Sequence, residues 1–346
     1  MTRKRIVKVF RFVFWWFRGF ILRLSFRGSR VGEQLAGLSR VKLIVQPDAG
    51  IAPIVTAIKQ AKKTIDILIF RLDRYEIARA LGEAVTRGVN VRALTAHQNR
   101  GGTKSLRKLE MKLLESGVTV SRTADDLVRY HGKMMIVDGR FLHVYGFNFT
   151  GLDIKNCRSF GVVTKNPKLV GEAMKLFEAD FERQPYVPAC DRLVVSPENA
   201  RERLAKFIGA ARRQLLIYDP QVTDDAMLRI LTEKIKEGVD VKIIGKVEAK
   251  WNIKGEPYPG KRLHIRTIIR DGKRAFVGSQ SLRRLELDKR REVGIIITDE
   301  NVIGDLRATF ERDWAQTESG KKEKKKEKKA DRKAERKDAK PLPKAS

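Results

Sequence analysis

Two histidines of this chain lie in the same local pattern, with a cation two residues later and an Asp-Gly pair starting seven residues later. The two blocks are His131-Gly-Lys133-Met-Met-Ile-Val-Asp138-Gly139 and, 133 residues further on, His264-Ile-Arg266-Thr-Ile-Ile-Arg-Asp271-Gly272. An imidazole can attack phosphorus or protonate a leaving oxygen, because its usual pKa of ~6.5 lies near working pH. Cations stabilise the charge that develops on a phosphoryl group. Two such blocks therefore predict attack on a phosphodiester.

The duplication extends on both sides of these blocks. Gly161 aligns with Gly294 at the same offset, and segment 61–92 aligns with segment 211–242 at an offset of 150. The first half therefore holds 17 more residues before its histidine, which we interpret as a longer loop. Because this repeat period is far too long for a solenoid, the chain is predicted to contain two similar halves.

Each half alternates helix-like and strand-like segments. Apolar residues recur at helical spacing in 54–61, and each histidine block indicates strand, turn at Asp-Gly, strand. The other strand-like runs are 65–70, 89–94, 215–218 and 239–244. This order predicts an α/β fold in which each half is a sheet flanked by helices.

We divide the chain into four segments. They are a basic aromatic segment that interacts with membranes (1–32), the first half (33–188), the second half (189–318) and a Lys-rich tail that is disordered or helical (319–346).

The paired blocks resemble the signature of the phospholipase D superfamily, in which His-x-Lys-x4-Asp occurs once in each of two halves. The resemblance covers roughly residues 40–315. It implies two phospholipase D-like halves packed around one shared site, a covalent phosphohistidine intermediate, and no metal or other cofactor. The chain has four histidines, no Cys-x-x-Cys and no acidic cluster at ligand spacing, so a metal site has little to be built from.

Four positions depart from the family pattern. Arg266 replaces the usual lysine, Gly146 a serine, and Ser281 an asparagine, while Ser159 stands where the second half keeps the family glutamate as Glu292. The losses in the two halves are complementary, so one pooled site would still hold each kind of helper. We therefore expect an active enzyme, with a catalytically inactive relative as the alternative.

The candidate site follows from the blocks and this alignment. The predicted catalytic residues are His131, Lys133, Asp138, His264, Arg266, Asp271 and Glu292. The predicted substrate-binding residues are Asn148, Ser279 and Ser281. Among the catalytic set, the two aspartates end strands, and we expect them to form turns or support the site rather than react directly. No metal ligand is predicted.

The carboxylate also suggests how the two histidines divide the work. We expect Glu292 to lie beside His264, because a neighbouring carboxylate raises the pKa of an imidazole and favours its charged form. His264 would then act as the general acid. His131, without such a partner, would stay neutral and attack phosphorus.

The N-terminal segment predicts association with a membrane. Residues 1–32 hold nine Lys or Arg and no Asp or Glu, among many aromatic residues. Their longest uncharged run, 12–17, is far shorter than the ~20 residues that span a bilayer. A basic stripe opposite an aromatic face is typical of a helix lying in an anionic membrane surface. A single spanning anchor and a transit peptide are the alternatives, and the cytoplasmic face is favoured.

Two classes of substrate are open for the predicted chemistry. Phospholipid hydrolysis or phosphatidyl transfer, as in the phospholipase D and cardiolipin synthase branches, is favoured by the N-terminal segment, since a nuclease needs no membrane anchor. Cleavage of nucleic acid is permitted by the formal net charge of +31. The expected partners are an anionic phospholipid membrane and a phospholipid substrate, with nucleic acid as the alternative, and the oligomeric state is unknown.

Overall fold

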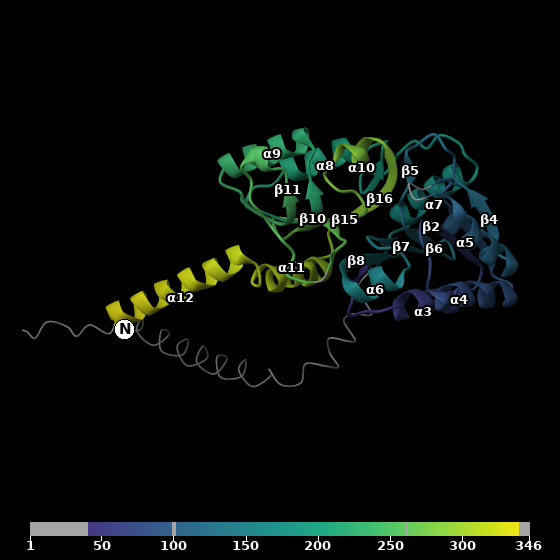
Figure 1. Cartoon of the computed structure of the whole chain (residues 1–346), viewed down its shortest axis with the longest axis horizontal. Coiled ribbons are helices and arrows are strands. Elements are labelled where there is room, and N and C mark those ends of the chain that lie inside the picture. The colour runs from purple at the N-terminus through teal and green to yellow at the C-terminus, as the bar shows by residue number, and fades with distance from the viewer. Residues whose placement is uncertain (1–40, 99–101, 261, 339–346) are drawn as a thin grey trace, which may run out of the picture. The chain divides into compact units, whose positions relative to one another are not determined.

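The computed structural model describes residues 41–98, 102–260 and 262–338, and it repeats one order of strands and helices (Figure 1). The predicted membrane segment 1–32 lies outside the described residues. In the described part, no helix is both long enough and apolar enough to cross a bilayer.

The first half begins at the first described strand and ends with a long helix. Its elements are β1 (Val41–Gln46), α3 (Ala52–Gln60), β2 (Thr64–Ile69), α4 (Tyr75–Thr86), β3 (Asn90–Thr95), α5 (Lys104–Glu115), β4 (Thr119–Arg122), β5 (Arg129–Tyr130), β6 (Met134–Val137), β7 (Phe141–Tyr145), α6 (Gly151–Asn156), β8 (Cys157–Thr164) and α7 (Pro167–Phe181).

The second half repeats this order and ends in the Lys-rich helix. Its elements are β9 (Leu193–Ser196), α8 (Ala200–Gly209), β10 (Gln214–Val222), α9 (Asp225–Lys236), β11 (Asp240–Val247), η2 (Ala249–Trp251), β12 (Gly255–Glu256), β13 (Arg262–Leu263), β14 (Arg266–Arg270), β15 (Arg274–Gly278), α10 (Arg284–Asp288), β16 (Arg290–Ile297), α11 (Glu300–Trp314) and α12 (Glu318–Asp338).

The element bounds reproduce both sequence offsets. Helices α4 and α9 start and end 150 residues apart, and α7 and α11 start and end 133 apart. The predicted α/β fold of two similar halves is confirmed. The interpretation of the extra residues as a loop is wrong, because they include α5 and β4. Helix α5 buries Leu106, Leu109 and Leu113, a helical spacing that the sequence already contained.

Each half builds its own mixed sheet. The strand orders are β1-β8-β7-β6-β2-β3-β4 and β12-β11-β10-β14-β15-β16, with β9 on the far side of β16. In each sheet, the hairpin that follows the histidine (β6–β7 or β14–β15) lies antiparallel beside a parallel pair (β2–β3 or β10–β11). The two motif hairpins therefore occupy equivalent positions in the two sheets.

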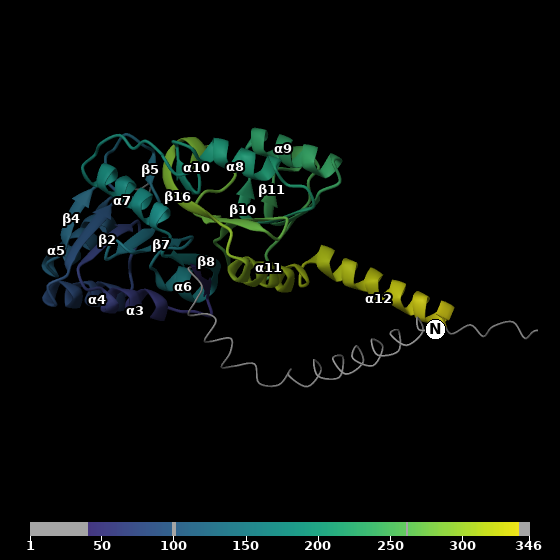
Figure 2. The same cartoon turned by 180° about the vertical axis from the view of Figure 1, so that it is seen from behind.

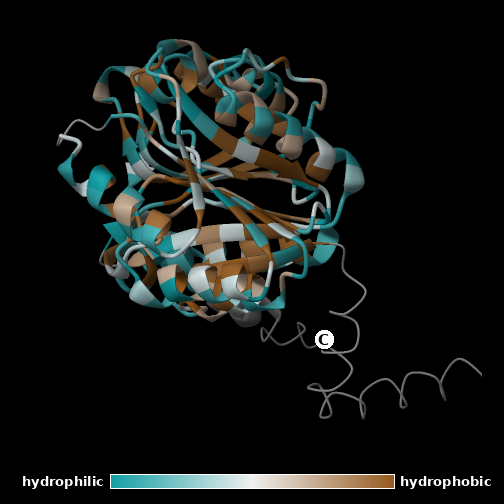
Figure 3. Ribbon diagram, turned by 90° about the vertical axis from the view of Figure 1, so that its right-hand side faces the viewer, coloured by the Kyte–Doolittle hydropathy of each residue, from teal (hydrophilic) through white to brown (hydrophobic). Residues whose placement is uncertain are grey.

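Three of the four clusters of buried apolar side chains in the described residues hold the layers together. Helices α3 and α4 pack on one face of the first sheet, and α8 and α9 pack on the corresponding face of the second sheet. The third cluster joins the opposite faces of both sheets with α7 and α11. Figure 2 shows the helices beside the two sheets, and Figure 3 shows hydrophobic strands lying between helices that carry many hydrophilic residues.

Short strands cross between the halves immediately before each motif. Strand β5 of the first half pairs in parallel with β16 of the second, and β13 of the second half pairs in parallel with β8 of the first. The amide of His131 donates to the carbonyl of Arg291 (2.7 Å), and the amide of His264 donates to the carbonyl of Arg158 (3.1 Å). The main chain of each motif histidine is therefore held by the opposite half.

Two ion pairs also connect the halves, each between an arginine of one half and an aspartate of the other. Arg158 on β8 lies 3.0 Å from Asp313 on α11, and Arg291 on β16 lies 3.0 Å from Asp180 on α7. The residue numbers in the two pairs differ by 133 at both ends, so the pairs are copies of one ancestral contact. Asp313 also accepts a hydrogen bond from the hydroxyl of Tyr218 (2.6 Å).

The Lys-rich tail is helical in its described part, which is one of the two alternatives that the sequence left open. Its carboxylate at Glu323 accepts from Trp314 Nε1 (3.0 Å) and from Lys242 Nζ (2.7 Å). The first turns of α12 are therefore attached to the second half.

We expect Asp313→Ala to lower the free energy of unfolding by roughly 3 kcal/mol, because it removes a buried carboxylate from the half-buried Arg158 guanidinium and from the buried Tyr218 hydroxyl. Urea unfolding measures this change. The control is Glu311→Ala on the same helix, which removes an exposed pair with Arg307 and should change stability by less than about 0.5 kcal/mol. Equal losses in the two variants would contradict a structural role for the exchanged pairs.

Candidate active site

The first motif histidine is buried against the second half. His131 is 8% exposed, and its Nδ1 lies 2.9 Å and 3.0 Å from the two carboxylate oxygens of Glu292 on β16. The next residue, Gly132, approaches the same strand so closely that a Cβ would lie 2.8 Å from a methyl carbon of Val293. The glycine of the first motif thus permits the contact that brings His131 to Glu292.

This contact corrects the predicted partner of the glutamate. Glu292 lies beside His131, whereas the sequence suggested His264. The reason is the strand exchange, because β5 places the first motif on β16 and thereby on the carboxylate of the other half. Sequence alignment shows which residues are equivalent, but it does not show which half supplies the contact.

The second motif histidine also takes its carboxylate from the opposite half. His264 is 8% exposed, and its Nδ1 lies 3.5 Å from Asp153 on α6. The carboxylate of Asp153 accepts from the amide (2.9 Å) and the side chain (2.7 Å) of Asn148, and from Arg262 (2.8 Å). Ser159, at the place of the missing glutamate, donates its hydroxyl to the carbonyl of His264 (2.7 Å).

Sequence reasoning missed Asp153. Its only signal was the alignment at an offset of 133, which pairs Asp153 with Glu286, so that both halves carry an acidic residue six positions before Ser159 or Glu292. The acidic pair was visible, but its relation to a histidine of the other half was not.

The two motif cations lie in different surroundings. Lys133 is 1% exposed, its Nζ is 3.0 Å from His131 Nδ1, and the ring centroid of Phe70 is 5.6 Å away. Burial lowers the pKa of Lys133 to about 7, opposed by the charge of Glu292. Arg266 donates from Nε to the hydroxyl of Ser281 (3.1 Å). Within the described part of the chain, its buried Nη1 has no hydrogen-bond partner.

The two motifs act on each other electrostatically. Burial lowers the pKa of both His131 and His264 well below the usual range, and each histidine is affected further by both Lys133 and Arg266. Burial raises the pKa of Glu292, opposed by the same two cations. The structure therefore brings both histidines, both cations and a carboxylate from each half into one charged cluster.

The predicted substrate-binding residues border this cluster. Asn148 holds Asp153, and its buried side-chain oxygen has no partner among the described residues. The hydroxyl of Ser279 interacts with Glu292 and accepts from the amide of Val293 (3.2 Å). Ser281 holds Arg266, so these side chains orient charged groups of the site.

The structure leaves little room for a side chain at Gly146, where the family usually has a serine. A Cβ at this position would lie 3.2 Å from the carbonyl oxygens of Gly278 and Phe160, and 3.3 Å from the hydroxyl of Ser159. A side chain here would therefore require its neighbours to shift, whereas glycine lets β7 and β15 approach closely.

Asp138 and Asp271 lie apart from the reacting groups, at the turns that follow β6 and β14. Asp138 accepts from three consecutive amides, Lys62 to Thr64, at 2.7–3.1 Å, and Asp271 accepts from Arg212 to Gln214 at 2.7–3.2 Å. Both have φ of +54°. They tie each motif turn to the start of β2 or β10, as expected for turn-forming residues.

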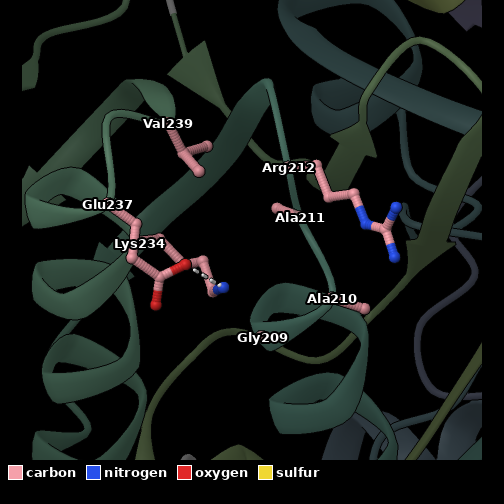
Figure 4. A pocket seen from close by; sticks show the side chains of 7 residues that line it. All are labelled: Gly209, Ala210, Ala211, Arg212, Lys234, Glu237 and Val239. Atoms are coloured by element: carbon pink, nitrogen blue, oxygen red, sulfur yellow. Dashed lines mark hydrogen bonds and ion pairs between the residues drawn. The ribbon is translucent and has the colours of Figure 1, made fainter.

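A surface hollow of about 440 Å³ lies elsewhere, where α8 and α9 end (Figure 4). Its lining contains none of the predicted site residues, and its Lys234 is paired with Glu237 (2.6 Å). In residues 41–98, 102–260 and 262–338, no group of three His, Cys, Asp or Glu side chains is arranged to hold a metal ion.

Comparison with known proteins finds a family model that spans both motifs. The family model described as "Cardiolipin synthase, PLD-like domain" matches residues 54–183 and 245–314, which include both motifs. A curated relative, "Mitochondrial cardiolipin hydrolase" from Danio rerio, is 30% identical over 127 residues. That match covers 34% of this chain and 53% of the relative, so the chain spans about half of the length of the relative.

Two solved structures share the fold over most of this chain. Polyphosphate kinase from Porphyromonas gingivalis gives a TM-score of 0.67 at 18% identity and covers 78% of this chain and 46% of that chain. Phosphatidylserine synthase from Haemophilus influenzae Rd KW20 gives a TM-score of 0.60 at 11% identity, and the match covers 80% of this chain and 85% of that chain. At these identities the likeness shows the fold alone.

Lys133 predicts a pH dependence of stability. Between pH 7 and 10.5 the folded protein binds fewer protons at Lys133 than the unfolded chain does, so its contribution to stability rises with pH in this window. The Lys133→Met variant lacks this linkage. From pH 7 to pH 9, the unfolding free energy of the wild type should therefore rise by about 2 kcal/mol relative to the variant.

Urea unfolding of both proteins at the two pH values measures this difference. The control is Lys175→Met, because Lys175 is 69% exposed and its replacement should give the same difference at both pH values. If the unfolding free energies of wild type and Lys133→Met differed by the same amount at both pH values, the pKa of Lys133 would not be lowered by folding.

Proposed function

Because the chain belongs to the phospholipase D-like family described as "Cardiolipin synthase, PLD-like domain", we propose that it hydrolyses or transfers phosphodiesters of phospholipids through a phosphohistidine at His131. Members of the phospholipase D superfamily are phosphodiesterases or phosphatidyltransferases. The observation that carries the proposal is the contact of His131 Nδ1 with Glu292 across the two halves.

In the first step His131 attacks phosphorus from Nε2. Glu292 accepts a hydrogen bond from Nδ1–H of His131, which keeps the lone pair on Nε2. The same carboxylate stabilises the positive charge that the ring gains as the P–N bond forms. The P–O bond to the leaving alcohol breaks, and His264 gives its proton to the departing oxygen. Lys133 and Arg266 hold the non-bridging oxygens as their charge grows.

In the second step His264 acts as the base. It takes a proton from water or from an acceptor alcohol, whose oxygen attacks phosphorus while the P–N bond breaks and the electron pair returns to His131. His264 must be protonated before the first step, although burial lowers its pKa. The charge of Asp153 and that of a bound diester both favour the imidazolium. The sequence-based roles of the histidines are retained, but for a different reason, since Glu292 serves the nucleophile.

Two features support phospholipid as the substrate. The family description names cardiolipin synthase, and the curated relative is named as a cardiolipin hydrolase. In addition, residues 1–32 combine nine basic residues with many aromatic ones, a composition suited to an anionic membrane surface. Nucleic acid is the second candidate, favoured by the formal net charge of +31.

A chromogenic diester separates the roles of the histidines. Bis(p-nitrophenyl) phosphate has a leaving group that needs little protonation, so His264→Asn should complete the first step and stop at the phosphohistidine. We expect a single-turnover burst of p-nitrophenol and a mass increase on His131 in this variant. His131→Asn should give neither. The control His143→Gln alters a buried histidine that contacts Tyr145 (3.1 Å), and should retain turnover. A covalent adduct on His264, with none on His131, would reverse the roles.

The substrate class is tested by direct competition. Vesicles of cardiolipin or phosphatidylglycerol and a single-stranded oligonucleotide are offered to the full chain, and released phosphatidic acid, new phosphatidyl esters and cleaved oligonucleotide are measured. Lipid products support the proposal. Turnover of the oligonucleotide with no lipid product would contradict a phospholipid substrate. The proposed phosphohistidine intermediate would remain compatible with that result.

We also propose that residues 1–32 attach the protein to the membrane, either in the surface plane or as a single anchor. Deleting them should leave the fold intact, because the repeated elements begin at β1, and should release the protein from anionic vesicles. Each basic residue near an anionic surface contributes about 1 kcal/mol. Flotation with vesicles at low and high salt measures the loss. A truncated protein that binds as fully as the whole chain would show that the basic body or tail is the binding surface.

A further inference from the structure

Arg266 has a buried acidic neighbour that no motif contains. We propose that Asp219 is a positioning residue, which acts through Ser281 to hold the guanidinium of Arg266 toward the reacting phosphoryl group. This inference rests on the proposed function for its chemistry. Asp219 would be the residue that allows the site to use an arginine where the family usually has a lysine.

The contacts form a chain from the carboxylate to the cation. Arg266 Nε donates to the Ser281 hydroxyl (3.1 Å), and this hydroxyl interacts favourably with the carboxylate of Asp219. Asp219 is 2% exposed and is fixed by the amides of Leu282 (2.7 Å) and Gln221 (3.0 Å). With both oxygens anchored to the main chain, the carboxylate has little freedom to follow a displaced guanidinium.

Strand pairing explains why the carboxylate reaches this arginine. The β10–β14 pairing ends at Tyr218 and Thr267, and Asp219 and Arg266 are the next residues of the two strands, close enough for their charges to interact. Strand β10 is irregular after Tyr218, and the neighbouring strand has glycine at Gly245, where a Cβ would come within 1.6 Å of the Asp219 carbonyl oxygen. Gly245, with φ of +148°, therefore permits the local backbone that carries Asp219.

The first half has a different pair at the equivalent place. The β2–β6 pairing ends at Leu68 and Met134, so Ile69 and Lys133 follow this pair along their strands as Asp219 and Arg266 follow theirs. In the first half the residue at this position is apolar, and the cation is a lysine, which can lose its proton. In the second half the residue is a carboxylate, and the cation is an arginine, which stays protonated. A permanent charge that is partly buried is stabilised by a nearby opposite charge, which Asp219 supplies to Arg266.

Inorganic phosphate is the probe, and its affinity for the full chain is measured by isothermal titration calorimetry at constant ionic strength. Replacing Asp219 by Asn removes a negative charge near an anion site. If the carboxylate acted only by its charge, phosphate would bind more tightly. Because we expect it to position Arg266, Asp219→Asn should instead weaken phosphate binding by about fivefold or more.

A double-mutant cycle shows that the effect passes through the arginine. In an Arg266→Met background, Asp219→Asn should change the phosphate affinity by less than about twofold. Ser281→Ala breaks the same link while keeping the carboxylate, so it should weaken binding as Asp219→Asn does, and it serves if Asp219→Asn fails to fold. The control Asp66→Asn disrupts the pair with Arg92 (2.7 Å) on the equivalent strand of the other half and should leave phosphate affinity unchanged.

Unchanged or tighter phosphate binding by Asp219→Asn and Ser281→Ala, additive losses in the cycle, or no binding by the wild type would overturn the inference. Its failure is separable from that of the proposed function. A positive phosphate cycle in a protein that turns over no diester refutes the function alone, and turnover with a negative cycle refutes the role of Asp219 alone.

Discussion

The site depends on one constraint, which is that each motif histidine is hydrogen-bonded through its main chain to a strand of the opposite half. The amide of His131 binds β16 and the amide of His264 binds β8. Neither half can therefore place its own histidine without the other. The exchanged pairs Arg158–Asp313 and Arg291–Asp180 connect the same two strands to a carboxylate of the opposite half. Folding of the interface and assembly of the site are consequently one event.

The exchange lets the two halves diverge without losing the site. A symmetric pair of halves would give each histidine the same carboxylate, but here Glu292 contacts His131 while Ser159 occupies the other copy. Asp153, six residues earlier in the chain, lies 3.5 Å from His264 instead. The shorter contact fixes the tautomer of His131, as the proposed nucleophile requires, whereas the longer contact leaves the imidazole of His264 freer to gain and lose a proton.

Much of this arrangement could be predicted from sequence, and the part that could not has a physical reason. The repeated spacing predicted the two halves, the strand-turn-strand pattern of each motif, and the turn role of Asp138 and Asp271, since these depend on local pattern. The partner of Glu292 and the role of Asp153 depend on which strands are exchanged between halves. Alignment of a duplicated chain establishes equivalence, and contact across the pseudo-symmetric interface is a separate property that requires the fold.

The two cations show how a duplicated site can assign different work to equivalent positions. Lys133 is buried beside Phe70, and burial lowers its pKa to about 7, so its charge depends on what occupies the site. An entering phosphodiester would favour the ammonium, since an adjacent anion raises the pKa of a lysine. Arg266 keeps its charge throughout and therefore needs a standing partner. In the proposed reaction, the charge of Lys133 would respond to substrate binding, whereas that of Arg266 would be present throughout, a difference that two identical halves could not provide.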